Sequence, residues 1–286
     1  MARFLTRLMD AQGFWARPLG DFNRRWLAAI YDHIGPLKDL AHGRWLGHPL
    51  HAATTDIPIG ALTVTLVLDL LNQRAAADIA LVVGILFMVL SAVSGAADYT
   101  DTDGTAFMRA TVHSVIMVVA LFLYLVSLVM RTGNPVDRTG PVVLSVVAYL
   151  VLTAGAYVGG DVVYVLGNMV DRHAFGGRGT KWQPLDLGHL KELPEGTPVK
   201  GRAGGQSIVL VRAGDRIHAM HETCAHAGGP LSEGKIVNGC IECPWHGSLY
   251  RLADARVVRG PSVYDQPRYE VRTAAAGGFE VRRIPN

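Results

Sequence analysis

The chain has 286 residues, enough for about two domains. Half of the residues are apolar and only 18% are charged, a composition that indicates a membrane protein if the apolar residues occur in long runs. The net charge of +3 is too small to suggest a nucleic-acid partner, and three cysteines cannot all pair with one another, so the composition argues against a disulfide framework.

Residues 1–50 are mixed and basic, and they form the first predicted region. Phe22, Trp26 and Ile30 recur at helical spacing, which predicts at least one short amphipathic helix. Basic residues combined with tryptophan suit the interface between membrane and water. The alternative is that these apolar side chains pack on the helix's own domain.

Four long apolar segments follow, at about 52–71, 76–97, 110–130 and 141–166. Each is close to the ~20 residues that are needed to cross a bilayer. They predict a domain of four transmembrane helices over residues 51–170. The first segment is the weakest candidate because it contains Asp56 and Asp69, and acidic side chains inside a membrane are costly unless they are paired.

The distribution of lysine and arginine predicts the orientation of these helices. Eleven of them flank one side of the predicted membrane domain and only three flank the other. Because the more basic side normally faces the cytoplasm, we expect a multi-pass protein of the cell inner (cytoplasmic) membrane with both termini in the cytoplasm. Only the loops at 72–75 and 131–140 should face outward.

Residues 171–181 contain several glycines and basic side chains and predict a linker. From residue 182 onward apolar and polar residues alternate, as at 207–212 and 269–272, which is the period of a strand with one buried face. Residues 182–286 therefore predict a small soluble all-β domain. The predicted fold class is a membrane α-helical domain with four transmembrane helices, followed by this soluble domain.

Two boxes in the β domain, CAHAGGPL and CPWHGSLY, combine cysteine with histidine. Cys224 precedes His226 by two positions and Cys243 precedes His246 by three, with sixteen residues between the pairs. Two cysteines and two histidines are a common set of zinc ligands. The unequal spacings and the glycine-rich loops, however, differ from a repeated zinc knuckle.

The two boxes resemble the ligand loops of Rieske iron–sulfur proteins, whose pattern is C-x-H, a spacer, and C-P-x-H-G. The resemblance covers residues 182–286 and implies a Rieske domain that binds a [2Fe-2S] cluster. By this resemblance, Cys224 and Cys243 bind one iron, and His226 and His246 bind the other. Neutral imidazoles in place of two thiolates make the cluster less negative, which raises its reduction potential.

The second box also carries residues that tune such a cluster. Ser248 and Tyr250 match the serine and tyrosine that donate hydrogen bonds to the cluster in the Rieske proteins of cytochrome bc complexes. The disulfide between the loops of those proteins is absent, because Gly229 and Trp245 stand at the matching positions. We therefore expect a reduction potential between the bc-type and ferredoxin-like classes. Cys240 is not a ligand in the family pattern and is interpreted as a strand residue.

The membrane half contains its own candidate site. Four histidines are expected near the cytoplasmic face: His48, His51, His113 and His173. Such a group suggests a metal or b-type haem site, because neutral imidazoles are common haem ligands, and His51 with His113 is the candidate pair. A quinone or another cofactor is a second interpretation. A third is that these histidines bond headgroups, water or neighbouring carboxylates.

The membrane segment, which includes HPLH and DIPIG, is similar to an uncharacterised bacterial membrane domain, the DUF2231 group, over about residues 45–170. This resemblance implies no settled function.

The whole sequence predicts a membrane-anchored Rieske protein that relays single electrons at the cytoplasmic face. The expected partners are membrane lipid, an unidentified redox protein, and a quinone or haem in the membrane domain. The first alternative is a redox sensor or assembly factor that uses the cluster. The second is an oxygenase component. It is less favoured, because the 40 residues after His246 contain no histidine for a mononuclear iron site.

Overall fold

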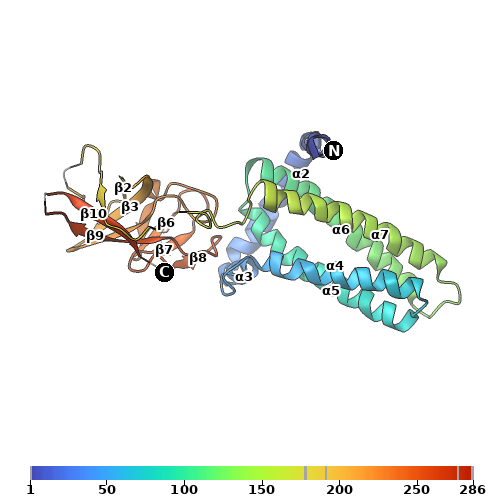
Figure 1. Cartoon of the computed structure of the whole chain (residues 1–286). Helices are drawn as coiled ribbons and strands as arrows, with labels where there is room; N and C mark the ends of the chain where they lie inside the picture. The colour runs from blue at the N-terminus through green and yellow to red at the C-terminus, as the bar shows by residue number, and fades with distance from the viewer. Residues whose placement is uncertain (1, 177–178, 191, 276, 285–286) are drawn as a thin grey trace. The chain divides into compact units, whose positions relative to one another are not determined.

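The computed structural model describes residues 2–176, 179–190, 192–275 and 277–284. It divides the chain into two units, one helical and one built of strands (Figure 1). Met1–Gly43 and Pro49–Asn168 form the helical unit, and Arg44–His48 and Met169–Asn286 form the β unit.

Three helices precede the long ones, namely α1 (Ala2–Asp10), α2 (Gly13–His33) and α3 (Gly35–His42). The amphipathic helix predicted from residues 22–30 is part of α2. It packs through small residues: a side chain on Gly20 would come within 2.6 Å of Thr111. Phe22, Trp26 and Ile30 are instead exposed, with 66%, 49% and 46% of their surface accessible. These three side chains therefore lie outside the described core of the helical unit.

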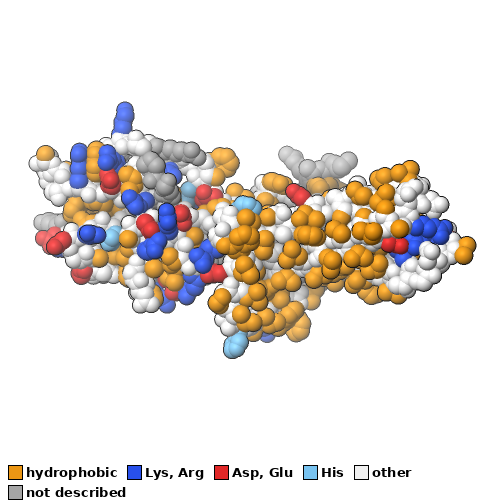
Figure 2. All heavy atoms as spheres, turned by 90° about the horizontal axis from the view of Figure 1, so that it is seen from below, with side chains coloured by type: hydrophobic (Ala, Val, Ile, Leu, Met, Phe, Trp, Pro, Cys, Tyr) orange, Lys and Arg blue, Asp and Glu red, His pale blue; other side chains and the backbone are white. Residues whose placement is uncertain are grey.

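Four longer helices follow: α4 (Leu50–Leu70), α5 (Arg74–Thr100), α6 (Gly104–Arg131) and α7 (Thr139–Gly160), which continues through a π-helical turn to Val165. Within the described residues, these four helices are long and apolar enough to cross a membrane. The four apolar segments predicted from the sequence are therefore confirmed as helices. Figure 2 shows hydrophobic side chains over the visible face of this unit.

The long helices form two hairpins, α4 with α5 and α6 with α7 (Figure 1). Their shared core contains Leu62, Leu81, Ile85, Met88, Ala120, Tyr124, Ala148 and Leu152. Gly84 lets α4 and α5 approach closely, since a side chain there would lie 2.6 Å from Leu62. This core fills the part of the bundle away from His51 and His113.

Buried ion pairs explain the acidic residues in the helices. In the first predicted span, Asp69 accepts a 2.6 Å bond from Arg131, and both side chains are almost fully buried. Arg131 also contacts Asp78 at 3.1 Å, and Arg138 donates to both oxygens of Asp78 at 2.8 Å. Of the two acidic residues that made this span the weakest candidate, Asp69 is therefore neutralised by α6, and Asp56 is exposed.

We expect Arg131→Met to lower the free energy of unfolding by about 3–5 kcal/mol, because it leaves the Asp69 carboxylate buried without its partner. Unfolding of the detergent-solubilised chain, followed by circular dichroism, measures this change. The double variant Arg131→Met with Asp69→Leu is the control and should recover most of the loss. A single-variant cost below about 1 kcal/mol, typical of exposed pairs, would contradict the assignment.

The acidic stretch after α5 also pairs with basic groups. Asp101 lies 3.2 Å from His42 and 3.0 Å from Lys38. The pKa of His42 is raised: burial opposes its charged form, but the hydrogen bond to Asp101 and the neighbouring carboxylates outweigh burial. Arg109 bonds Asp161 and, at 2.8 Å, Asp10. These pairs hold the short N-terminal helices on the bundle.

The β unit contains two antiparallel sheets in its described part. One has the strand order β1-β10-β9-β4-β3-β2 and the other has the order β5-β6-β7-β8. The strands of the first sheet are β1 (Gln183–Leu185), β2 (Val199–Ala203), β3 (Gln206–Ala213), β4 (Arg216–His221), β9 (Arg268–Thr273) and β10 (Phe279–Ile284). Those of the second are β5 (Lys235–Val237), β6 (Cys240–Glu242), β7 (Leu249–Arg251) and β8 (Val257–Arg259). The predicted all-β domain is confirmed.

The core of the β unit joins the two sheets. Val209 and Met220 of the first sheet pack in one buried cluster with Ile241 and Tyr250 of the second. The cluster also contains Cys224 and Cys243. The two cysteines of the predicted site therefore lie at the hydrophobic junction between the sheets.

The segment that follows the last membrane helix is attached to the β unit. Tyr264 donates a 2.9 Å hydrogen bond to the Met169 carbonyl, and the Arg172 amide donates to the Ala225 carbonyl at 3.3 Å. Part of the stretch predicted as a linker, residues 171–176, thus belongs structurally with the strands.

Candidate metal centre

Two loops with the same backbone pattern carry the predicted ligands. In each loop the cysteine amide bonds the carbonyl five residues later, and the cysteine carbonyl accepts from the glycine amide four residues later. These bonds are Cys224 to Gly229 (2.8 Å), Gly228 to Cys224 (3.0 Å), Cys243 to Ser248 (2.9 Å) and Gly247 to Cys243 (3.0 Å). Gly228 and Gly247 have φ angles of +89° and +72°, which only glycine adopts at little cost. The glycines of the boxes are therefore needed to close the loops.

The two loops bring the cysteines together in the core. Cys224 and Cys243 are 1% and 2% exposed. A hydrogen bond from Cys224 lowers the pKa of Cys243 to about 6, against the effect of burial and with help from the amides of Trp245 and His246. The His226 amide donates to Cys224 in the same way. Amides directed at sulfur favour the thiolate, which is the form that binds metal.

The same loops bring the histidines together. The ring centroids of His226 and His246 are 5.0 Å apart and the ring planes are nearly perpendicular, at 88°. Two imidazoles on one tetrahedral metal, with bonds of about 2.0 Å, place their ring centres about 5 Å apart. The four predicted ligands thus form a pair of thiols and a pair of imidazoles, which fits the donor set of a binuclear [2Fe-2S] centre.

Tyr250 and Ser248 lie beside this group and are fully buried. The Tyr250 hydroxyl is 3.1 Å from the sulfur of Cys224. The Ser248 hydroxyl oxygen accepts a 3.0 Å bond from the Ser262 amide, so it still has its own proton to donate. Tyr250 is therefore placed to donate to a ligand sulfur, and Ser248 links the second loop to the turn after β8.

Gly229 and Trp245, which occupy the positions of the bc-type disulfide, are in contact. A side chain on Gly229 would lie 2.8 Å from the Cys243 sulfur and 3.1 Å from the Trp245 ring. The indole thus covers the other loop at the place where a disulfide joins the two loops in the bc-type proteins.

Gln266 and His173 support the first loop, and the sequence motifs did not indicate either of them. Gln266 is fully buried. Its side-chain oxygen accepts a 2.7 Å bond from the Ala225 amide, and its side-chain nitrogen donates a 3.2 Å bond to the Thr223 carbonyl, so it holds the backbone on both sides of Cys224. His173 Nε2 lies 2.8 Å from the same Thr223 carbonyl. The sequence offered one indication of a structural role for Gln266, namely its position two residues before the β9 strand. His173, expected from the sequence near the membrane histidines, lies in the β unit.

Two of the four membrane histidines do come together. The rings of His51 on α4 and His113 on α6 are 6.3 Å apart between centroids. His48 belongs to the β unit and is exposed. Of the predicted group of four, the helical unit contains the pair that was proposed as haem ligands.

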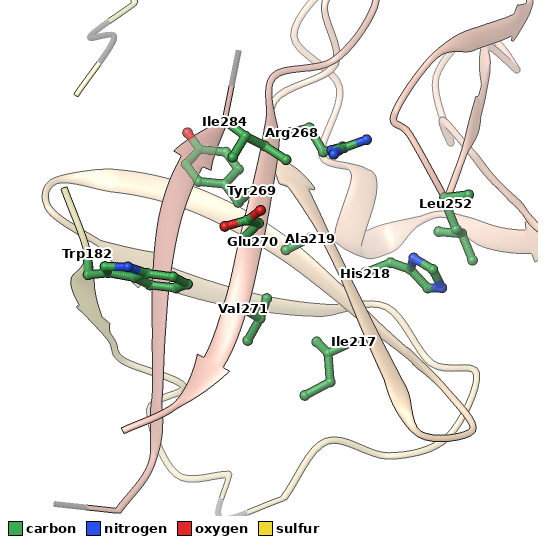
Figure 3. Close-up of a pocket in the computed structure, with 11 residues that line it drawn as sticks. Trp182, Ile217, His218, Ala219, Leu252, Arg268, Tyr269, Glu270, Val271 and Ile284 are labelled. Atoms are coloured by element: carbon green, nitrogen blue, oxygen red, sulfur yellow. The ribbon is translucent and has the colours of Figure 1, made fainter. Parts of the chain in front are cut away.

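A separate hollow of about 300 Å³ lies on the β unit (Figure 3). Trp182 lines one side of it, His218 and Leu252 another, and Tyr269 and Glu270 lie between them. Its lining contains neither the four predicted ligands nor Ser248 and Tyr250. The candidate metal centre is therefore defined by the two loops and not by this hollow.

Comparison with known proteins identifies both parts of the chain. Residues 182–270 match the Rieske [2Fe-2S] domain, and residues 47–172 match a family described as "Predicted membrane protein (DUF2231)". The anthranilate 1,2-dioxygenase ferredoxin subunit of Burkholderia cepacia is 42% identical over 69 residues, which is 24% of this chain and 62% of that protein. Ferredoxin CarAc of Metapseudomonas resinovorans is 31% identical over 70 residues, 24% of this chain and 65% of that protein.

Among solved structures, the ferredoxin of carbazole 1,9a-dioxygenase from Nocardioides aromaticivorans IC177 matches with 26% identity and a TM-score of 0.31, over 36% of this chain and 98% of that one. The chain spans less than two thirds of the length of the two ferredoxins compared by sequence. The chain therefore joins an N-terminal DUF2231 membrane domain to a C-terminal Rieske [2Fe-2S] domain.

Proposed function

We propose that this chain is a membrane-anchored carrier of single electrons, with a [2Fe-2S] cluster bound by Cys224, Cys243, His226 and His246. One observation carries the proposal: two loops of identical backbone pattern present a buried thiol pair and an imidazole pair with centroids 5.0 Å apart. Bound there, the cluster supplies a one-electron redox centre.

The chain's own residues set the conditions for that centre. The amides of Trp245 and His246 direct their N–H groups at the Cys243 sulfur, and Tyr250 lies at hydrogen-bond distance from Cys224. Such donors favour added negative charge on sulfur and so favour the reduced state. Trp245 is 57% exposed and sits beside the ligand loops, which offers a redox partner protein a docking point close to the imidazoles.

The proposal puts both termini and the Rieske domain on the cytoplasmic side of the cell inner membrane. The excess of lysine and arginine on that side supports this orientation. The exposed Phe22, Trp26 and Ile30 of α2 support its contact with lipid headgroups. Protease should release the Rieske domain from inverted membrane vesicles and not from spheroplasts, and the opposite pattern would refute the orientation.

The decisive experiment uses the full chain purified in detergent. Non-haem iron and acid-labile sulfide should be present in equal amounts, and a Rieske EPR signal should appear only after reduction with dithionite. Rapid mixing of the reduced protein with ferricyanide or a short-chain ubiquinone analogue should then remove the signal without loss of iron. Zinc in place of iron, or a reduced signal that neither oxidant removes, would overturn the proposal. The two oxidants also distinguish a soluble acceptor from a quinone.

A further inference from the structure

A histidine site in the helical unit is built twice from the same parts. His51 of α4 bonds through Nδ1 to the Ser91 carbonyl of α5 at 2.8 Å, and His113 of α6 bonds through Nδ1 to the Gly155 carbonyl of α7, also at 2.8 Å. The acceptor lies 40 residues after the first histidine and 42 after the second. Each hairpin therefore contributes one histidine held by the backbone of its second helix.

A glycine accompanies each histidine at the same place. Gly95 and Gly159 each follow the carbonyl acceptor by four residues, one helical turn later. A side chain on Gly95 would lie 2.8 Å from the His51 ring, and one on Gly159 would lie 2.9 Å from the His113 ring. Both rings thus lie flat against a neighbouring helix where only glycine leaves room. The repetition of this arrangement in two hairpins indicates a shared role for the two rings.

The carbonyl partners determine the tautomer of both rings. A carbonyl oxygen only accepts hydrogen bonds, so Nδ1 must carry the proton in His51 and in His113. Each Nε2 then carries a lone pair that can bind a metal. This is the arrangement of metal-binding histidines, whose second nitrogen is oriented by a carbonyl or carboxylate.

The separation of the rings gives the coordination geometry. Bonds of about 2.0 Å from metal to nitrogen, plus roughly 1.1 Å from nitrogen to ring centre, put two trans imidazoles about 6.3 Å apart. The His51 and His113 centroids are 6.3 Å apart. The pair in the Rieske domain, at 5.0 Å, corresponds instead to two ligands at a near-tetrahedral angle. The membrane pair is therefore suited to bind a metal from opposite sides.

We infer that His51 and His113 are the two axial ligands of a haem iron bound between the hairpins. A six-coordinate metal with two trans imidazoles has four remaining coordination positions. The four nitrogens of a porphyrin occupy these positions without further protein ligands, which suits an otherwise apolar setting. Every residue of α6 from His113 to Met117 is only half-buried, although these five residues span more than one full turn.

The test uses the full chain expressed with added 5-aminolevulinate and purified in detergent. The expected result is a Soret band, sharp visible bands on reduction, and stoichiometric protohaem in the pyridine haemochrome assay. Because the imidazole planes are 78° apart, the ferric EPR spectrum should be of the strongly anisotropic low-spin type with one dominant low-field feature. Coplanar imidazoles would give a rhombic spectrum instead.

His51→Gly and His113→Gly should each lower the haem content at least about tenfold, in line with the loss of a metal ligand, and added imidazole should restore the bands. His48→Ala is the matched control and should keep full haem. The reduced Rieske EPR signal should persist in all variants, which shows that the β unit is folded and separates this inference from the proposed function, and recovery of the haem bands with imidazole shows that the helical unit is folded. Haem that survives both glycine variants, no Soret band in haem-supplied protein, or a bare metal ion in place of haem would overturn the inference.

Discussion

Cys243→Ser should abolish the Rieske EPR signal, whereas Cys240→Ser should leave it intact. The two residues are three positions apart and both are buried, so the comparison separates a ligand from a neighbouring thiol. The Cys243 sulfur lies beside Cys224 and accepts from loop amides. Cys240 is in β6, and its nearest polar contact is the Asn238 carbonyl at 3.8 Å. Serine in place of Cys243 offers a hydroxyl that does not replace the thiolate ligand.

Iron content and reduced EPR spectra of the three purified proteins check this prediction. Loss of the cluster should also lower the unfolding temperature of the β unit, because ligand binding is coupled to folding. Cys224→Ser is the companion variant and should behave like Cys243→Ser. A normal signal in Cys243→Ser, or loss of signal in Cys240→Ser alone, would show that the second loop binds the metal in another way.

Tyr250→Phe should lower the reduction potential of the cluster by about 30–65 mV. The Tyr250 hydroxyl is 3.1 Å from the Cys224 sulfur and is fully buried. A hydrogen bond to a charged acceptor contributes about 1.5–3 kcal/mol, and roughly half of this should distinguish the reduced from the oxidised state. For a one-electron couple 59 mV corresponds to a factor of ten, or about 1.4 kcal/mol. Phenylalanine keeps the packing of the core and removes only the donor.

A redox titration followed by EPR measures this shift. Ser248→Ala should also lower the potential. Ser248 directly follows the ligand loop, and its hydroxyl proton is available to donate a hydrogen bond to the cluster. Tyr269→Phe, a buried tyrosine of the other core, is the control and should leave the potential unchanged. An unchanged potential in Tyr250→Phe would remove Tyr250 from the tuning group. The wild-type potential itself should lie well above the about −400 mV of plant-type ferredoxins.

Much of this protein was predictable from local patterns. The four spans were visible because a bilayer demands about 20 apolar residues in a row. The strands were visible because a half-buried sheet alternates with period two. The loops at Cys224 and Cys243 were predictable because both ligands and the closing glycine of each loop lie within five residues. The membrane domain was identified by its resemblance to a family, because no short motif in it indicates a particular chemical function.

The sequence by itself determined which segments cross the membrane and which residue types meet at the two ligand loops, because those features depend on contacts between near neighbours in the chain. Only the tertiary structure decided that His51 meets His113, that Arg131 neutralises Asp69, and that Gln266 supports the loop of Cys224. These contacts join residues 40 or more positions apart. No periodicity encodes such a pairing, since it arises from the packing of whole helices and sheets against one another.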